Sequence, residues 1–442
     1  MKRVIRAVIA MGASAMGSVA SAQDERALTD PYRVAIEVSK AVDAADSKLS
    51  VFRPGVREDG SWGLALISGI SSERDGTILH QAYLGELGRY FYPASTVKLY
   101  AALAAYETVN ELALVHPDAN ISETTPLRIY PMGDEGFPRD FDPTHTKTQG
   151  RGIGPGPLTP AREAHKIFVV SDNPAFNTLY DFVGQDDLNR RIRQWGAHAT
   201  QIVHRLAIAL TADENRRAPR VDLGFGPGAP QIGERTATMP HAIQPQTEGF
   251  LLGRGFLQSG TLVEEPFDFS DKNFTTLLDL QLVLARLVRP DISHFECCPT
   301  IRDDGMFASM KTGPLPGRPI DLTDAQRVQL IASATMYPRE SVSPRYDPAE
   351  YPDDHAKFLL PGLLRVRPLE EWRIVNKIGL AYGFVTENAY VEHRPTGHAV
   401  FVAAVIHRNP NGIYNDNQYD YETTLAEMAT LGEVVGRALV GD

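Results

Sequence analysis

The apolar pattern of the chain changes twice between its two ends, from strands to helices and back to strands. Near the N-terminus, two apolar runs at residues 62–70 and 77–85 are separated by the polar segment Ser-Ser-Glu-Arg-Asp-Gly, which is typical of a β-hairpin. The last third of the chain holds three further alternating segments, at residues 372–378, 384–392 and 398–407. A single sheet with strands from both ends of the chain accommodates this order.

Apolar residues at helical spacing predict helices at 32–48, 95–112, 160–170, 174–183, 274–288, 322–334 and 422–439. We therefore predict an α/β (α+β) fold: an antiparallel sheet flanked by helices and built from both chain ends, with an inserted all-helical region. Within one domain at residues 23–442, the sheet part covers 32–98 and 368–442, and the helical part covers 99–367. The substrate cleft is expected where the two parts meet.

The composition is that of an acidic globular protein. Of the 442 residues, 43% are hydrophobic and 22% are charged, which provides enough apolar mass for a large core. The net charge of -11 argues against a nucleic-acid partner, because phosphate binding depends on basic residues. The two cysteines, Cys297 and Cys298, are adjacent, so they form no disulfide staple of ordinary geometry and are too few for a structural zinc site. They are either incidental or joined in a rare vicinal disulfide.

The first 22 residues have the pattern of a secretory signal peptide. A basic start with Lys2 and Arg3 is followed by the apolar stretch Val8–Val19 and by the small residues Ala20-Ser21-Ala22. No later stretch has the 18 or more apolar residues that a membrane-spanning helix needs. We expect a periplasmic or secreted protein without a membrane span.

A serine and a lysine three residues apart form the sharpest chemical motif. Ser95 follows Pro93 at the expected start of a long helix, and Lys98 lies one turn later on the same helix face. An amine whose pKa is lowered by burial can take the hydroxyl proton, and the helix N-terminus offers N–H groups to an oxyanion. Because such a pair also arises by chance on a helix surface, its significance depends on further motifs.

A polar turn, Ser171-Asp172-Asn173, follows the predicted helix at 160–170. In the cleft, Ser171 can relay a proton and Asn173 can hydrogen-bond a substrate amide, while Asp172 braces the turn. The alternative is an ordinary helix-capping turn without a catalytic role.

The third motif is Lys377-Ile378-Gly379 on a predicted strand. Lys377 supplies positive charge, Gly379 allows substrate to approach the strand edge, and the N–H of Leu380 is a second oxyanion donor. Lys311-Thr312-Gly313 is a competing segment, but the prolines that follow it exclude a central strand, so the context favours Lys377.

These three motifs, in this order, resemble the signature set of the serine β-lactamase and penicillin-binding protein superfamily, and specifically of its class A-like serine hydrolases. The resemblance covers roughly residues 32–442. It implies that Ser95 is the acylated nucleophile, that Lys98 is its activating base or a partner to it, and that Ser171 relays the proton to the leaving nitrogen. It also implies an oxyanion hole made by the N–H groups of Ser95 and Leu380.

The chain departs from the family pattern at two positions. The family carries a Glu that activates the deacylating water, and the nearest acids in the corresponding loop are Asp213 and Glu214. Glu214 is the candidate catalytic residue for this role, although its position favours an ordinary surface acid. The family usually has a hydroxyl residue where this chain has Ile378, and Ile cannot bind a substrate carboxylate.

The sequence thus predicts a β-lactamase-like hydrolase that acts on a small β-lactam or peptidoglycan-like substrate as a monomer, with no cofactor and no metal. The alternatives are a D-alanyl-D-alanine carboxypeptidase, another peptidase or esterase, and a penicillin-binding receptor that hardly deacylates. Glu214 separates them, because slow deacylation is expected if its side chain points to solvent.

Overall fold

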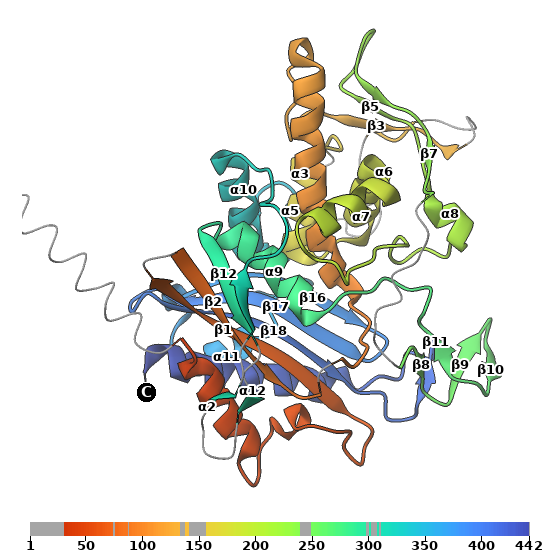
Figure 1. Cartoon of the computed structure of the whole chain (residues 1–442). Coiled ribbons are helices and arrows are strands. Elements are labelled where there is room, and N and C mark those ends of the chain that lie inside the picture. The colour runs from red at the N-terminus through yellow and green to blue at the C-terminus, as the bar shows by residue number, and fades with distance from the viewer. Residues whose placement is uncertain are drawn as a thin grey trace, which may run out of the picture.

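The computed structural model describes residues 31–441, apart from 74–75, 87, 133–137, 141–155, 239–248, 298–299, 302–306 and 309–310. A seven-stranded sheet of order β15-β12-β2-β1-β18-β17-β16 lies at its centre (Figure 1). Its strands are β1 (Trp62–Glu73), β2 (Gly76–Leu84), β12 (Ile292–Cys297), β15 (Lys311–Pro314), β16 (Trp372–Ala381), β17 (Phe384–His393) and β18 (His398–His407). The predicted signal segment at 1–22 and Cys298 lie outside the described residues.

The two ends of the chain meet in the middle of this sheet. β1 pairs antiparallel with β2 on one side and with β18 on the other, with Leu66 opposite Ala403. The predicted mixed fold, with a sheet built from both chain ends, is confirmed in these strands. β12 differs from the prediction, because it comes from the expected helical part and pairs parallel with β2.

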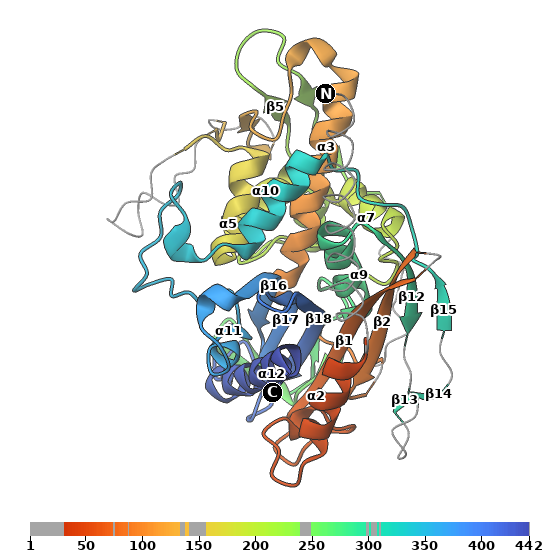
Figure 2. The ribbon, with the colours of Figure 1, turned by 90° about the vertical axis from the view of Figure 1, so that its left-hand side faces the viewer.

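Helices cover both faces of the sheet, as the two views in Figures 1 and 2 show. Along β18, Val400, Val402 and Ala404 pack into one buried cluster with α2 and α12, while Phe401 and Ala403 pack into the other with α3 and α9. Strands buried on both faces are apolar along their whole length, which explains the near-continuous apolar sequence of β18.

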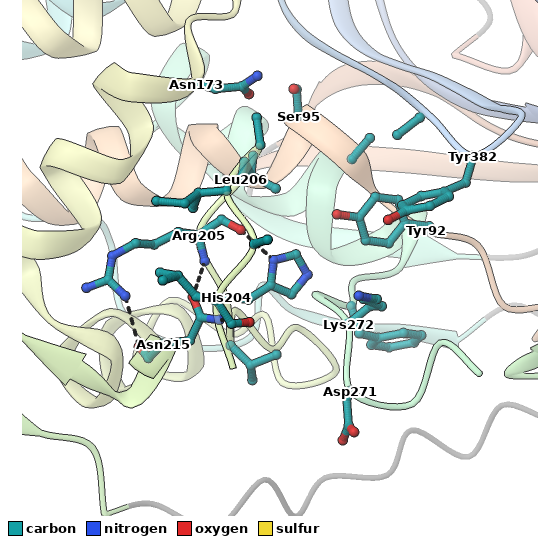
Figure 3. A pocket seen from close by; sticks show the side chains of 18 of the residues that line it. Tyr92, Ser95, Asn173, His204, Arg205, Leu206, Asn215, Asp271, Lys272 and Tyr382 are labelled. Atoms are coloured by element: carbon teal, nitrogen blue, oxygen red, sulfur yellow. Dashed lines mark hydrogen bonds between the residues drawn. The ribbon is translucent and has the colours of Figure 1, made fainter. Parts of the chain in front are cut away.

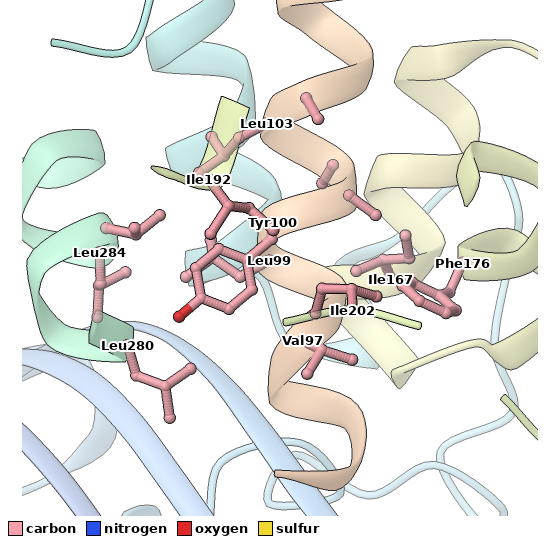
Figure 4. Close-up of a cluster of buried hydrophobic side chains, with 14 of the residues drawn as sticks. Val97, Leu99, Tyr100, Leu103, Ile167, Phe176, Ile192, Ile202, Leu280 and Leu284 are labelled. Atoms are coloured by element: carbon pink, nitrogen blue, oxygen red, sulfur yellow. The ribbon is translucent and has the colours of Figure 1, made fainter. Parts of the chain in front are cut away.

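The helices are α2 (Arg33–Asp43), α3 (Lys98–Val115), α5 (Pro160–Val170), α6 (Asn173–Val183), α7 (Gln185–Gln194), α8 (Ala212–Arg216), α9 (Leu277–Val288), α10 (Asp324–Thr335), α11 (Leu360–Leu363) and α12 (Tyr421–Val440). α3 is the central helix of the upper layer, and every residue from Lys98 to Val109 is buried. Figure 4 shows Leu99 and Tyr100 of α3 between α9 and the pair α5 and α6. Among the described residues, no helix is long and apolar enough to cross a membrane.

The inserted region is not all-helical, contrary to the prediction, because short strand pairs interrupt it. Its small sheets are formed by β3 (Leu127–Ile129), β5 (Val221–Leu223) and β6 (Gln231–Ile232); β4 (Arg217–Ala218) and β7 (Arg235–Thr236); β8 (Leu251–Leu252) and β11 (Phe267–Asp268); β9 (Gly255–Gln258) and β10 (Thr261–Val263) with β19 (Ile413–Tyr414); and β13 (Thr300–Ile301) and β14 (Phe307–Ala308). Strands of two to four residues carry too little alternation to be recognised in a sequence.

Candidate active site

Ser95 lies in a turn of 3-10 helix, η2 (Ala94–Val97), that leads directly into α3. The helix was expected to begin at Ser95, and a tighter turn takes that place. Ser95 is partly exposed, whereas residues 91–94 and 96–98 around it are buried. Ala94 has a φ of +47°, in the left-handed region that non-glycine residues rarely adopt. The turn therefore presents one side chain, the Ser95 hydroxyl, at the surface of a cavity that it lines.

Two buried lysines meet at the hydroxyl of Ser171. Nζ of Lys98 lies 3.2 Å from Ser171 Oγ and also donates to the Ser171 carbonyl oxygen, and Nζ of Lys377 lies 2.7 Å from the same Oγ. Ser171 ends α5 in a left-handed conformation, with a φ of +58°. A hydroxyl has two lone pairs and one proton, so an Oγ that accepts from both amines directs its own proton elsewhere.

The pKa values of both lysines are lowered, chiefly because the amines are withdrawn from water. Burial lowers the pKa of Lys98 to about 7, although the charge of Asp172 opposes the shift. Burial and then the neighbouring charge of Lys98 hold the pKa of Lys377 well below its ordinary value, and Glu387 opposes this. A lysine with a pKa near 7 is neutral in about half of the molecules at neutral pH and can accept a proton.

A buried polar network lies behind Lys377, and the sequence reasoning missed it. Glu387 of β17 accepts from Asn376 Nδ2 at 2.6 Å and from the N–H of Phe358 at 2.7 Å. Lys357 Nζ donates to Asn376 Oδ1 at 2.8 Å. β16 and β17 contain other polar residues as well, among them Arg373 and Asn388, so the sequence pattern did not single out Asn376 and Glu387.

Gly379 brings strand β16 against the Ser95 turn. A Cβ atom at Gly379 would lie 2.4 Å from the carbonyl oxygen of Pro93 and 3.2 Å from the backbone nitrogen of Ser95. β16 is an edge strand, and Leu380, a residue that is 37% exposed, lines the cavity. The backbone of Ser95 and the segment that carries the Leu380 N–H thus border the same space.

Asn173 begins α6 and lines the cavity close to Ser95 in the view of Figure 3. The preceding Asp172 caps α6, because its Oδ1 accepts from the N–H of Ala175 at 2.7 Å. The predicted bracing by Asp172 is therefore a helix cap. Ile378 follows Lys377 in β16. Its side chain is buried in the hydrophobic cluster that contains α12, on the face of the sheet opposite to α3.

Lys311 lies in β15, at the edge of the sheet opposite to β16. The segment that contains Lys311, Thr312 and Gly313 is therefore a strand, but an edge strand, as the prolines that follow it require. Lys377 of β16 donates to Ser171 Oγ at 2.7 Å.

Glu214 lies at the N-terminus of α8, where its carboxylate forms a capping box. Glu214 Oε2 accepts from the N–H of Thr211 at 2.7 Å and from the Thr211 hydroxyl at 2.8 Å. These bonds from Thr211 lower the pKa of Glu214, and the side chain is exposed. The sequence Thr211-x-x-Glu214 is itself a capping-box signature, so it predicts the start of a helix at Thr211.

The cavity beside Ser95 has a volume of about 1370 Å³ and is partly walled by aromatic rings. Tyr92 and Tyr382 meet edge to face with ring centroids 5.2 Å apart, and His204 stacks on Tyr92. The sequence reasoning did not assign these residues, nor Lys272, to the site. Among the described residues, no three His, Cys, Asp or Glu side chains gather as a metal site would need.

The chain is similar to several solved structures of beta-lactamases. One from Sphaerobacter thermophilus has 15% sequence identity and a TM-score of 0.43, with 92% of this chain and 96% of that chain covered. One from Xanthomonas campestris has 16% identity and a TM-score of 0.44, with 92% and 97% covered. One from Burkholderia ambifaria has 16% identity and a TM-score of 0.42, with 86% and 94% covered. No curated protein sequence matches the chain significantly.

The segment that holds most of the motifs matches a family model. Residues 86–222 match the model of the Beta-lactamase enzyme family. This segment contains Ser95, Lys98 and Ser171, whose side chains border the candidate site. Over this segment, the resemblance to the serine β-lactamase and penicillin-binding protein superfamily that the motifs predicted is confirmed.

Proposed function

We propose that the protein is a class A-like serine hydrolase that opens the amide bond of β-lactams through an acyl-enzyme on Ser95. The observation that carries the proposal is the Ser171 hydroxyl, which accepts from Lys377 and from Lys98, the residue three positions after Ser95 in the turn that leads into α3. This arrangement supplies a nucleophile, a base with a pKa near 7 and a proton relay.

In the proposed reaction, Ser95 Oγ attacks the carbonyl carbon and its proton passes to the neutral amine of Lys98. The N–H groups of Ser95 and Leu380 stabilise the oxyanion of the tetrahedral intermediate. When the C–N bond breaks, Ser171 gives its proton to the leaving nitrogen and recovers one from the Lys98 ammonium, to which it is hydrogen-bonded. Water then cleaves the Ser95 ester and releases the acid. Asn173, Lys377 and Gly379 bind and admit the substrate.

The position of Glu214 supports a second candidate function, in which the acyl-enzyme forms but deacylates slowly. Glu214 is exposed, and the two hydrogen bonds described for its carboxylate come from Thr211 and form the capping box of α8. Ile378, buried on the far face of the sheet, also offers no hydroxyl to a substrate carboxylate. A penicillin-binding receptor that hardly deacylates fits these two observations.

The proposed substrates are encountered outside the cytoplasm. We infer export from the signal-like pattern at residues 1–22 and propose a periplasmic or secreted monomer. Turnover of β-lactams there would confer antibiotic resistance. The inference is tested by N-terminal sequencing and size-exclusion chromatography of the exported protein.

The test of the proposed function follows intact mass and absorbance together, with a fluorescent penicillin and a chromogenic cephalosporin. Turnover with a transient adduct that peptide mapping assigns to Ser95 supports the hydrolase, and a stable Ser95 adduct supports the slowly deacylating alternative. Ser95→Ala is expected to abolish both. Absence of any adduct would refute the β-lactam substrate and point to esters or linear peptides.

A further inference from the structure

The cavity beside Ser95 extends away from the proton-relay side of the site. Lys98, Ser171 and Lys377 do not line it, whereas Ser95, Asn173 and Leu380 do. In the proposed reaction, the leaving nitrogen takes its proton from Ser171 and therefore faces the relay side. The acyl group that stays on Ser95 then occupies the cavity, and this step rests on the proposed function.

Two cations occur among the described residues that line the cavity, and they differ in their partners. Arg205 forms an ion pair with Asp181 at 2.7 Å and also donates to the carbonyl oxygen of Arg217 at 2.7 Å. Lys272 has no carboxylate within ion-pair distance among the described residues, and its ammonium lies 5.7 Å from the ring centroid of Phe267. Burial lowers the pKa of Lys272, and the nearby Asp271 opposes this. Lys272 is therefore a partly desolvated charge without a fixed counterion.

The groups around Lys272 leave it free to receive an anion. Asp271 is exposed, and Figure 3 shows its carboxylate pointing away from Ser95. His204 lies beside Lys272, and burial lowers the pKa of His204 to about 4, so its ring is neutral. Nδ1 of His204 lies 2.6 Å from the carbonyl oxygen of Arg205 and therefore carries the proton. The neutral ring thus adds neither a competing anion nor a second positive charge.

Aromatic rings lie between Lys272 and Ser95 in the view of Figure 3. Tyr382 follows directly after β16 and adopts a φ of +55°, although Gly or Asn would relieve the strain of this turn. Its ring contacts Tyr92 at 5.2 Å and Phe269 at 5.4 Å between centroids, so it is fixed against the cavity wall. A strained backbone that places a ring at a ligand cavity points to a binding role for that ring.

We propose that Lys272, Tyr92 and Tyr382 select substrates whose acyl side chain carries both an aromatic ring and a carboxylate. The ring packs against the two tyrosines and the carboxylate pairs with Lys272. The partly buried position of Lys272 strengthens this pair relative to one in water.

Two penicillins that differ by one carboxylate test this proposal. Benzylpenicillin and carbenicillin share a phenyl ring in the acyl side chain, and carbenicillin adds a carboxylate next to it. We expect the ratio of their second-order rates of Ser95 acylation, followed by intact mass, to favour carbenicillin. In Lys272→Met this ratio is expected to fall about tenfold or more, and in Lys272→Arg it is expected to be retained. Lys40→Met, which removes an exposed lysine of α2, is the matched control and leaves the ratio unchanged.

A binding measurement separates failure of this proposal from failure of the proposed function. Phenylmalonate monoamide and phenylacetamide, which reproduce the two penicillin side chains with and without the extra carboxylate, are titrated calorimetrically into the wild type and Lys272→Met. If neither penicillin acylates Ser95, tighter binding of phenylmalonate monoamide that is lost in Lys272→Met still supports the subsite. Equal binding of the two amides, no binding of phenylmalonate monoamide, or a rate ratio that Lys272→Met leaves unchanged overturns it.

Discussion

Replacement of Lys98 by methionine is expected to stabilise the protein while it abolishes reaction at Ser95. Lys98 is fully buried, and burial lowers its pKa from 10.5 to about 7. Between these two values the unfolded chain binds a proton that the native state does not, so stability increases with pH in this range. At 1.36 kcal/mol per pKa unit, the penalty is about 5 kcal/mol below pH 7 and disappears as the pH approaches 10.5.

Methionine has a similar length and no charge, so Lys98→Met removes this penalty. It also removes the two bonds that Lys98 donates to Ser171, which costs about 1–3 kcal/mol. At pH 6 we therefore expect the variant to be more stable by about 2–4 kcal/mol. The advantage should decrease by about 1.4 kcal/mol for each pH unit above 7, because the wild-type penalty fades.

Urea unfolding followed by circular dichroism between pH 6 and pH 9 measures this difference. Lys40→Met is the control, since the Lys40 side chain is 66% exposed and should show no pH-dependent difference from the wild type. If Lys98→Met is no more stable than the wild type at pH 6, or if its advantage is the same at pH 6 and pH 9, Lys98 is not a desolvated amine. The proposed base would then lose its physical basis.

Three further outcomes follow from the same geometry. Acylation of Ser95 should rise with pH through an apparent pKa of about 7, since only the neutral amine of Lys98 accepts a proton; rates measured from pH 5 to pH 9 that stay flat would contradict this. Gly379→Ala should lower the acylation rate about a hundredfold and lower Tm, because the new Cβ would clash with the carbonyl oxygen of Pro93. Near-normal acylation kinetics would show that the turn containing Ser95 can move away from β16. Glu214→Gln should weaken the cap of α8 slightly and leave deacylation within threefold of the wild type, whereas a hundredfold loss would identify Glu214 as the deacylating base.

The parts of the fold that the sequence predicted are those with a long and regular period. The helix at Pro160–Val170 and the strands Phe384–His393 and His398–His407 repeat their apolar residues often enough to be recognised. β12 was missed because its pairing depends on β2, more than 200 residues earlier in the chain, and not on its own pattern. Such pairings are set by tertiary contacts, and a single sequence does not contain them explicitly.

The residues of the candidate site also fall into two groups, those recognised from local sequence and those brought together by tertiary packing. Ser95, Lys98 and Ser171 could be named as candidates because their proposed roles depend on local spacing and on short motifs. Glu387 and Lys357 were not found, because their proximity to Lys377 arises from packing between segments that are distant in the sequence. Burial, which lowers the pKa values of the lysines, is likewise a property of the assembled fold.

The backbone at the site is strained in the same region where the lysines are desolvated. Four non-glycine residues other than Asn adopt a left-handed φ there: Ala94 at +47°, Ser171 at +58°, Ala207 at +54° and Tyr382 at +55°. Ala94, Ala207 and Tyr382 line the cavity, and Ser171 accepts from both lysines. Each such residue costs about 1–2 kcal/mol relative to an unstrained conformation. A sheet covered on both faces offsets these costs, so the stability of the core is what permits Lys98 to stay desolvated and neutral in about half of the molecules at neutral pH.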